Sequence, residues 1–348
     1  MQPFRGVHYD VARGNYDSLT SLRRLIRYSA DCGLNELVLY MEDLWRYQHH
    51  PQLANAHAYR LEDMQALAEY AARHGVDFIP SLTTMGHSFH ILEKPAYRHL
   101  AFPGEQPDFD VFNPAVYQLF AELFDEVLPH FTSPYVFING DEVRHVDLSE
   151  EAREEARQHG IGSIYGRGMG KIAQLVIDRG RRPIMWHDML LHHPDSLAYL
   201  PKETIIAFWY YDYQPDYPAL NFFCEQGYDV IAAPGLMDNH ELPMNARALP
   251  SIQGQARAAQ QCIAANPGTG ACLGTMTTVW EKARWQHAQL AIYATGRWTE
   301  DAEIPQQQVL KDFPRDVFGL PNSPAGDAWT EASRQMLLVG LLANAQAG

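Results

Sequence analysis

The stretch that decides the fold begins with residues 135–142 (YVFINGDE) and ends with residues 183–186 (PIMW). Its first five and last four residues are short apolar runs, which predict two buried β-strands. Between them, residues 164–179 carry apolar side chains at helical spacing, and Gly180 ends that pattern. A strand, a helix and a second strand in this order predict a parallel βαβ unit.

The same alternation continues outward in both directions along the chain. We predict strands at residues 4–9, 36–41, 76–80, 135–139, 183–186, 204–209, 229–233 and 274–279. Helices are predicted at residues 17–32, 61–74, 113–128, 149–159, 164–179, 217–226, 251–265 and 283–295. This pattern predicts an α/β fold of the (β/α)8 (TIM) barrel type. An open doubly wound sheet is the alternative, but the glycine-rich fingerprint that such sheets carry after the first strand is missing.

The length and composition fit a single barrel. The chain has 348 residues, of which 46% are hydrophobic and 20% charged, so it can bury a large core and is not expected to be disordered. We predict a catalytic barrel at residues 1–300. Residues 301–348 are predicted to form a helical C-terminal extension that packs on the barrel.

The charge and the apolar segments limit the partners. The formal charge is −15, with 42 acidic and 27 basic side chains, which disfavours nucleic acid and anionic membranes. No apolar run is long enough to span a membrane, and residues 4–9 already predict a strand where a signal peptide would lie. The four cysteines lack CxxC spacing and are expected to be small buried side chains. We therefore expect a cytoplasmic protein, with a homodimer left open.

In a TIM barrel, functional residues gather at the C-terminal ends of the strands. Carboxylates and tryptophans recur at those ends, whereas lysine and arginine are scarce. Aromatic walls with carboxylates suit a small oligosaccharide or glycoside, because the apolar sugar faces pack on indole rings and the hydroxyls bond to the acids. Phosphate would need basic groups or a glycine-rich loop. Several histidines lie near one another, but no HExxH or HxH motif supports a metal, so neither a metal nor a cofactor is expected. The strand-end residues are Tyr9-Asp10, Glu42-Asp43, His87, Asp141-Glu142, Trp186-His187-Asp188, Trp209–Asp212, Asn239-His240 and Trp280-Glu281.

The sharpest feature is the pair Asp141 and Glu142 at the end of the fourth strand. Adjacent strand residues point to opposite faces, so both acids can serve one site only where the strand breaks, and Gly140 permits that break. The alternative is that one acid caps the next helix while the other is solvated. The seventh strand has no acid before Asp238 and Glu241. A paired Asp-Glu without an obvious distant nucleophile suits cleavage assisted by the substrate's own 2-acetamido group.

Four segments carry a resemblance to glycoside hydrolase family 20, which runs in order through most of residues 4–281. The resemblance implies a retaining exo-β-N-acetylhexosaminidase that works without a cofactor. In that family Asp141 would orient the acetamido group and Glu142 would be the general acid and base. The segments are residues 4–10 (FRGVHYD), 39–43 (LYMED), 79–87 (IPSLTTMGH) and 140–143 (GDEV).

The resemblance implies further roles around this pair. His87 would belong to a relay of an acid and a histidine that tunes Glu142, and Arg5 would bind sugar hydroxyls. Tyr211 would bond the acetamido oxygen, with Tyr210 as a close competitor. The tryptophans would form a cradle for the acetamido methyl group, and Asp212 would bind outer hydroxyls. The other predicted substrate contacts are Glu42, Asp43, Trp186, Trp209, Trp280 and Glu281.

Three positions depart from the family pattern. Phe137 and Asn139 stand where the family often has His and Gly, and Glu281 follows Trp280 without the usual gap. Two alternatives to the hexosaminidase therefore stay open. One is a barrel that binds amino sugars with little or no turnover, and the other is a glycosidase that uses two protein carboxylates on sugars without an acetamido group. The preference between gluco and galacto sugars is also open.

Overall fold

The computed structural model describes residues 3–104, 108–143, 149–236, 245–280 and 284–320, together with Gly326, Ala328 and Glu331. The strands in these residues are β1 Phe4–Asp10, β2 Glu36–Tyr40, β3 Trp45–Arg46, β4 Tyr59–Arg60, β5 Asp77–Ile79, β6 Tyr135–Asn139, β7 Arg182–Trp186, β8 Ile205–Trp209, β9 Asp229–Ala233, β10 Gly235–Leu236 and β11 Cys272–Val279. The helices are α1 Leu19–Asp31, α2 Leu61–Arg73, α3 Phe89–Leu92, α4 Pro114–Val127, α5 Glu150–His159, α6 Gly162–Ile177, α7 Asp188–His192, α8 Pro218–Glu225, α9 Asn245–Ala265, α10 Gln289–Glu300 and α11 Gln306–Phe318.

The main sheet has the strand order of a TIM barrel. Its order is β5-β2-β1-β11-β9-β8-β7-β6, so chain neighbours are sheet neighbours and the first strand lies beside the last. A parallel bridge between Ser81 and Phe137 links the segment after β5 to β6, which closes the order on itself. The backbone N–H of Leu82 donates to the carbonyl of Phe137 at 2.9 Å across this junction. The (β/α)8 prediction is confirmed for the described residues.

The contacts within the chain divide it into two compact units, each of which contains several of these strands. The first unit comprises Met1–Asn15, Arg24–Leu37 and Phe208–Gly348. The second comprises Tyr16–Arg23 and Val38–Ala207. These two units do not correspond to the predicted division into a barrel at residues 1–300 and an extension at residues 301–348, and that division stays a prediction.

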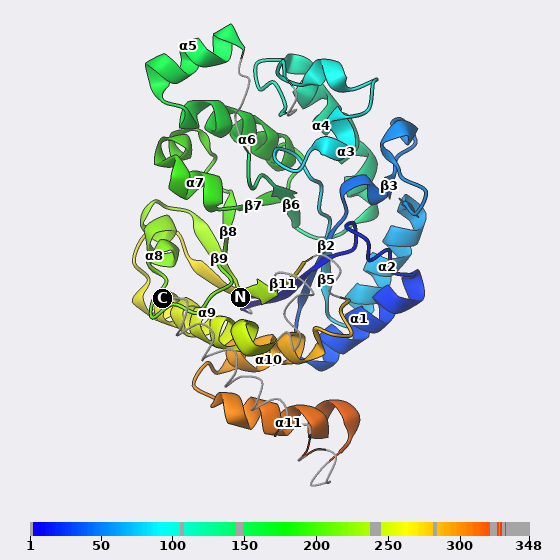
Figure 1. Ribbon diagram of the computed structural model, residues 1–348, viewed down its shortest axis with the longest axis vertical. Helices are drawn as coiled ribbons and strands as arrows, with labels where there is room; N and C mark the ends of the chain where they lie inside the picture. The colour runs from blue at the N-terminus through cyan, green and yellow to red at the C-terminus, as the bar shows by residue number, and fades with distance from the viewer. Residues whose placement is uncertain are drawn as a thin grey trace. The chain divides into compact units, whose positions relative to one another are not determined.

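The second unit is built around β6 and β7. Helix α6 lies beside both strands (Figure 1), and the rings of Phe137 and Trp186 pack at 4.7 Å between their centroids. Helix α4 begins as its sequence predicts, because the side chain of Asn113 accepts a hydrogen bond from the N–H of Ala115 and Pro114 occupies the first helical position. Helix α4 packs against α6, and apolar side chains of both helices are buried.

The first unit is built around β1, β9 and β11. Helices α9 and α10 lie side by side and both contact β11 (Figure 1). Helix α11 continues this layer, with the ring of Phe313 packed edge-on against Tyr293 of α10. All four cysteines are free thiols, and all but Cys32 are buried, as the sequence predicts. No helix in the described part of the chain is both long and apolar enough to cross a membrane.

Two helices differ from their predicted bounds. The helix predicted at residues 283–295 begins at Gln289 and ends at Glu300. Before it, the backbone forms a turn in which His287 donates to Arg284 and Ala288 donates to Trp285. Helix α9 begins six residues earlier than predicted, at Asn245, and accommodates Pro250 within it. The other predicted strands and helices agree with the structure to within a few residues, whereas the short elements β3, β4, β10, α3 and α7 were not predicted.

Candidate active site

The C-terminal end of β6 is held by contacts from several other segments of the second unit. The hydroxyl of Thr84 donates to the carbonyl of Ile138 at 2.5 Å. The side-chain amide of Asn139 donates to Ser81 Oγ and to the carbonyl of Leu82. Tyr165 of α6 donates its hydroxyl to the carbonyl of Gly140 at 2.6 Å. This segment therefore has its conformation imposed by its surroundings.

The strand breaks where the sequence predicts it, and both acids turn to one side. Asn139, Gly140 and Glu142 have φ values of 55°, 91° and 53°, which end the alternation of an extended strand. Glycine suits position 140, because a φ of 91° is unfavourable for a residue with a Cβ. The expectation that Gly140 lets the two neighbouring acids share one site is therefore consistent with the backbone.

His87 is the point at which the two carboxylates meet. Its Nε2 lies 3.3 Å from Asp141 Oδ2 and 3.3 Å from Glu142 Oε2. The interactions with Asp141 and then Glu142 raise the pKa of His87 to about 10, although burial acts in the opposite direction. A histidinium between two carboxylates is the form favoured at neutral pH. The side chain of Asp141 is 11% exposed and that of Glu142 is 61% exposed, so the pair has one buried and one accessible member.

The loop that carries His87 approaches the pair backbone to backbone. Gly86 and His87 have φ values of 71° and 44°. A Cβ added to Gly86 would overlap the carbonyl oxygen of Asp141, so only glycine fits. Nδ1 of His90 donates to the carbonyl of His87 at 3.2 Å and helps to fix the turn. Strained residues held by surrounding structure are typical of functional sites.

Asp188 supports the pair from the next strand. It is the first residue of α7, two residues after Trp186 at the end of β7, and its Oδ2 accepts the backbone N–H of Glu142 at 2.9 Å. Burial, and then the negative charge of Asp141, raise the pKa of Asp188 to about 6. The sequence placed Asp188 at a strand end but gave no signal of this contact, which depends on how α7 packs.

One acceptor of Asp141 has no partner among the described residues. Its Oδ2 faces His87, whereas its Oδ1 is buried and receives no hydrogen bond from any residue that the structure describes. Buried polar atoms are nearly always hydrogen-bonded, so a buried carboxylate oxygen without a partner among the described residues can accept a donor from a ligand. An amide N–H of a ligand is such a donor.

The other predicted acids and Arg5 occupy different environments. Asp43 accepts a hydrogen bond from the side-chain amide of Asn55 at 2.7 Å, and burial raises its pKa. Its neighbour Glu42 has a φ of 41°, another non-glycine residue in the left-handed region of the second unit. In the first unit, Arg5 lies near the start of β1, where its backbone N–H donates to Asn35. Arg5 Nε is buried and has no partner in the described part of the chain.

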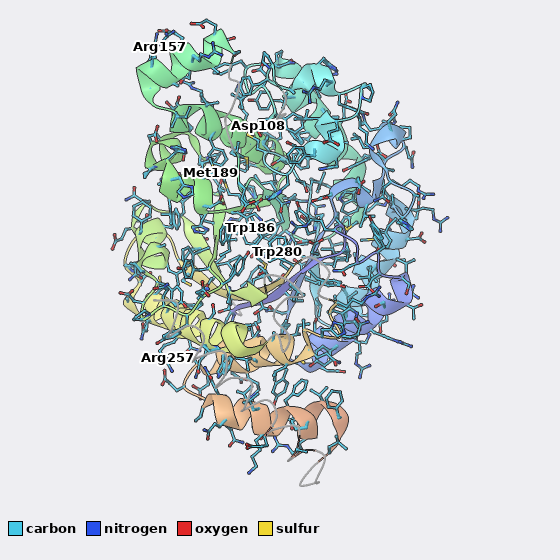
Figure 2. The ribbon with its side chains drawn as sticks, viewed as in Figure 1. Asp108, Arg157, Trp186, Met189, Arg257 and Trp280 are labelled. Atoms are coloured by element: carbon cyan, nitrogen blue, oxygen red, sulfur yellow. The ribbon has the colours of Figure 1, made fainter. Side chains whose placement is uncertain are left out.

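The predicted aromatic residues fall into two groups. Trp186, in the second unit, is completely buried with its ring against Phe137 (Figure 2). In the first unit, the rings of Trp209 and Tyr211 stack at 5.2 Å with an interplanar angle of 15°. Trp280 donates its indole N–H to the hydroxyl of Tyr211 at 2.6 Å. Tyr211 thus contacts both Trp209, the last residue of β8, and Trp280, the residue after β11.

Tyr210 points into a different set of contacts. Its hydroxyl accepts a hydrogen bond from Gln214, and its ring packs edge-on against Tyr217. The carbonyl of its neighbour Asp212 accepts a hydrogen bond from the hydroxyl of Tyr217. Of the two tyrosines that the sequence left as competitors, Tyr211 is the one associated with tryptophans. Glu281, predicted to bind sugar, lies outside the described residues, as do Asp238 and Glu241.

Sequence reasoning missed a buried ion pair beside Trp280. Asp10, at the end of β1, is fully buried and accepts a hydrogen bond from Arg13 Nε at 2.7 Å. The guanidinium of Arg13 also lies 5.1 Å from the centre of the Trp280 ring. The spacing of Asp10 and Arg13 just after a strand was the available signal. This pair fixes one face of the indole.

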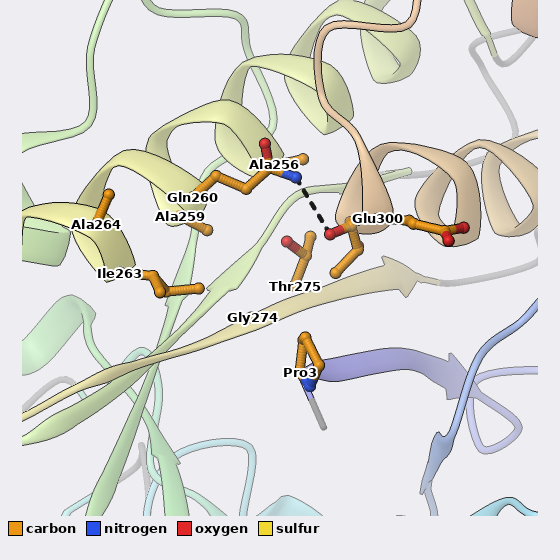
Figure 3. A pocket seen from close by; sticks show the side chains of 10 residues that line it. Pro3, Ala256, Ala259, Gln260, Ile263, Ala264, Gly274, Thr275 and Glu300 are labelled. Carbon is orange, nitrogen blue, oxygen red and sulfur yellow. Dashed lines mark hydrogen bonds between the residues drawn. The ribbon is translucent and has the colours of Figure 1, made fainter. Parts of the chain in front are cut away.

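A cavity of about 270 Å³ in the first unit lies away from these groups. It is lined by alanines of α9, by Ile263 and by Gly274 and Thr275 of β11 (Figure 3). Gly274 and Thr275 pair with Phe4 and Arg5, so the cavity lies at the N-terminal ends of β1 and β11. A barrel works at the opposite ends of its strands, and this cavity is therefore distinct from the candidate site. Within the described residues, no group of three His, Cys, Asp or Glu side chains is arranged to hold a metal ion.

The family is decided by a match along most of the sequence. The profile described as "Glycosyl hydrolase family 20, catalytic domain" matches residues 2–315. The chain belongs to glycosyl hydrolase family 20. The resemblance carried by the four sequence segments is confirmed, and with it the assignment to the glycoside hydrolases.

Among curated family 20 relatives, human hexosaminidase D is 27% identical over 224 residues, which cover 61% of this chain and 45% of that protein. A β-hexosaminidase of Emericella nidulans is 21% identical over 269 residues, which cover 67% of this chain and 43% of the relative. The chain thus spans less than half the length of these two relatives.

Solved structures of the family share the fold. An exo-β-N-acetylglucosaminidase from Vibrio harveyi, in complex with N-acetylglucosamine, superposes with a TM-score of 0.70 at 19% identity, covering 91% of this chain and 58% of that one. A β-N-acetylhexosaminidase from Bacteroides fragilis gives 0.67 at 18% identity, covering 85% and 65%. At these identities the likeness supports the TIM barrel of family 20.

Proposed function

We propose that the chain is a retaining exo-β-N-acetylhexosaminidase, which hydrolyses terminal β-linked N-acetylglucosamine or N-acetylgalactosamine by substrate-assisted catalysis. The observation that carries the proposal is the buried Oδ1 of Asp141, which has no hydrogen-bond partner among the residues that the structure describes. A 2-acetamido group offers one N–H donor, and its carbonyl oxygen is a nucleophile at the correct distance from the anomeric carbon of the same sugar. Membership of family 20 and the names of the relatives support the same substrate class.

The residues divide the chemistry between them. Asp141 accepts the acetamido N–H, which orients the carbonyl oxygen and increases its electron density. That oxygen attacks the anomeric carbon while Glu142 gives a proton to the leaving oxygen, so the glycosidic bond breaks and an oxazolinium ring forms. Water then attacks the same carbon, gives its proton to Glu142 and reopens the ring. Two inversions at one carbon retain the configuration.

The direction of the two carboxylates favours this route over a glycosidase with two protein carboxylates. Such enzymes need acids on opposite sides of the scissile bond, one of them placed as nucleophile. Asp141 and Glu142 instead converge on a single nitrogen of His87, each at 3.3 Å. The two acids therefore approach the site from one side, which leaves the nucleophile to the substrate.

We extend the proposal to the residues that line the sugar. Tyr211 donates its hydroxyl proton to the acetamido oxygen, and Trp209 and Trp280 provide aromatic faces for the methyl group. Trp186, which is completely buried, stays a predicted member of this cradle. The other predicted contacts with the sugar hydroxyls or with the rim of the site stay predictions. They are Arg5, Glu42, Asp43, Tyr210, Asp212 and Glu281. A cytoplasmic location and a homodimer stay predictions.

The test is turnover of an aryl N-acetyl-β-glucosaminide and of its galacto epimer. Replacing Glu142→Gln or Asp141→Asn is expected to lower kcat by about 10² to 10⁴, since each removes one positioned group from the transition state. Near-normal rates in either variant would overturn the proposal. Tight calorimetric binding of N-acetylglucosamine by the wild type, with no turnover of either substrate, would favour the amino-sugar-binding alternative.

A further inference from the structure

The backbone conformation of Glu142 is not explained by the residues next to it in the sequence. In an extended strand the side chains of residues 141 and 142 would point to opposite faces. Glu142 instead has a φ of 53°, a left-handed conformation that is unfavourable for a residue with a Cβ. Gly140 permits the bend before the pair, but it cannot hold Glu142 in that conformation.

The backbone N–H of Glu142 donates a hydrogen bond to the side chain of Asp188. Its Oδ2 accepts that N–H at 2.9 Å. The Asp188 carboxylate is buried at the first position of α7, two residues after the end of β7 at Trp186. The acceptor is therefore supplied by an element that is separate in sequence from β6.

We propose that Asp188 is a positioning residue, which fixes the Glu142 peptide in its left-handed turn so that the side chains of Asp141 and Glu142 both face His87. It acts through the backbone and needs no contact with the sugar. The geometric claim concerns His87 and the acid pair; its meaning for turnover rests on the proposed hexosaminidase activity.

The other contacts of this segment leave that task to Asp188. Tyr165 holds the carbonyl of Gly140, and Gly86 packs against the carbonyl of Asp141. These contacts locate the residues before Glu142 but not its N–H. Oδ1 of Asp188 is buried and has no hydrogen-bond partner within the described ranges, whereas Oδ2 accepts the backbone N–H of Glu142.

Two substitutions separate the acceptor from the charge. Asp188→Asn keeps a carbonyl oxygen for the Glu142 N–H and removes the charge, whereas Asp188→Ala removes both. With an aryl N-acetyl-β-glucosaminide, Asp188→Ala is expected to lower kcat by about 10²-fold with a smaller change in KM, because a displacement of about 1 Å at the reacting groups costs this much. Asp188→Asn is expected to stay within about tenfold of the wild type.

A second readout does not involve the reaction. The groups that raise the pKa of His87 are Asp141 and Glu142, so the His87 titration, followed by NMR, reports whether the pair still converges. In Asp188→Ala the pKa of His87 is expected to fall by about one unit or more, and in Asp188→Asn it should stay raised. A purely structural role would lower thermal stability without this selective shift.

The matched control is Asp77→Ala and Asp77→Asn. Asp77 is also a carboxylate of the second unit that accepts a hydrogen bond, from Ser133 at 2.6 Å, but it lies at the start of β5. Both control variants are expected to leave kcat and the His87 titration unchanged.

The outcomes distinguish this inference from the proposed function. Wild-type kcat and wild-type His87 titration in Asp188→Ala would overturn the role of Asp188. If Asp188→Ala does not fold, a hundredfold loss in folded Asp188→Asn would overturn it, because the acceptor is retained there. If Glu142→Gln keeps full activity, the proposed function fails, while the His87 titration still decides the positioning role.

Discussion

Gly86 and Asp141 meet backbone to backbone, so closely that a methyl group on Gly86 would overlap the carbonyl oxygen of Asp141. This contact joins the loop that carries His87 to the strand end that carries the acid pair. Because of this contact, the position of His87 depends on the backbone of Asp141, one of the two carboxylates that it binds. The geometry of the three functional groups is thus fixed largely by backbone packing.

Gly86→Ala is therefore expected to cost far more than an ordinary glycine substitution. Gly75→Ala is the matched control, because Gly75 has nearly the same φ, 73° against 71°, but no atoms within 4 Å of an added Cβ. The control should lower the free energy of unfolding by about 1–2 kcal/mol, the cost of the left-handed backbone. Gly86→Ala should lower it further and reduce kcat by about 10² or more. Equal losses in chemical denaturation and in kcat would contradict the close approach.

The raised pKa of His87 has a consequence for stability. Asp141 and Glu142 raise it to about 10, so the folded state binds this proton more tightly than the unfolded state, whose histidine titrates near 6.5. The resulting stabilisation is complete below pH 6.5 and is lost as the pH rises toward 10.

Urea denaturation of the wild type and His87→Gln at pH 6 and pH 9.5 measures this effect. The difference in free energy of unfolding between them should be smaller at pH 9.5 by roughly 1–2 kcal/mol, because His87 is partly exposed and water screens the ion pairs. A difference that is constant with pH would show that His87 does not hold its proton in this way.

The two tyrosines after β8 should behave differently. Tyr211 accepts the indole N–H of Trp280 and stacks on Trp209, whereas the hydroxyl of Tyr210 accepts a hydrogen bond from Gln214. Tyr211→Phe is expected to lower kcat about 10²-fold, the usual cost of losing one donor to a developing charge. Tyr210→Phe should change kcat by less than about threefold. The reverse order, measured with the same aryl glycoside, would assign the acetamido contact to Tyr210.

Arg13 is expected to be important for stability. Its substitution by glutamine leaves the fully buried Asp10 carboxylate without its cationic partner, which should cost about 2–4 kcal/mol. Arg27→Gln is the control, since Arg27 and Asp31 form an ion pair with both side chains 59% exposed, and should cost less than about 1 kcal/mol. Similar losses for both variants in urea would mean that the buried pair contributes little.

Local patterns were sufficient to predict much of the fold. Strands β6 and β9 have the bounds that their apolar runs predict, because such strands are buried and end at polar residues. The start of α9 was wrong, because Pro250 disfavours a helix interior and yet lies within the helix. The start of α10 was wrong because the turn at residues 284–288 has helical composition and its geometry is set by packing.

The site was predictable to the extent that it depends on neighbours in sequence. Gly140 directly precedes the acid pair, so the break in the strand at these residues can be predicted from neighbouring residues alone. The role of Asp188 and the need for glycine at position 86 arise from contacts between segments about 50 residues apart, which no local pattern records. The ion pair of Asp10 and Arg13 was predictable only in part. The two residues are close in sequence, but the burial of Asp10 depends on packing against distant segments.

The central claim is that the substrate's own acetamido group is the nucleophile and that Asp141 orients it. The most direct measurement is the ratio of kcat/KM for an aryl 2-acetamido-2-deoxy-β-glucoside to that for the aryl β-glucoside, in the wild type and in Asp141→Asn. The account predicts a ratio above about 10³ in the wild type, which falls at least about tenfold in Asp141→Asn because the orienting carboxylate is lost. A wild-type ratio near one, or a ratio that Asp141→Asn leaves unchanged, would contradict it.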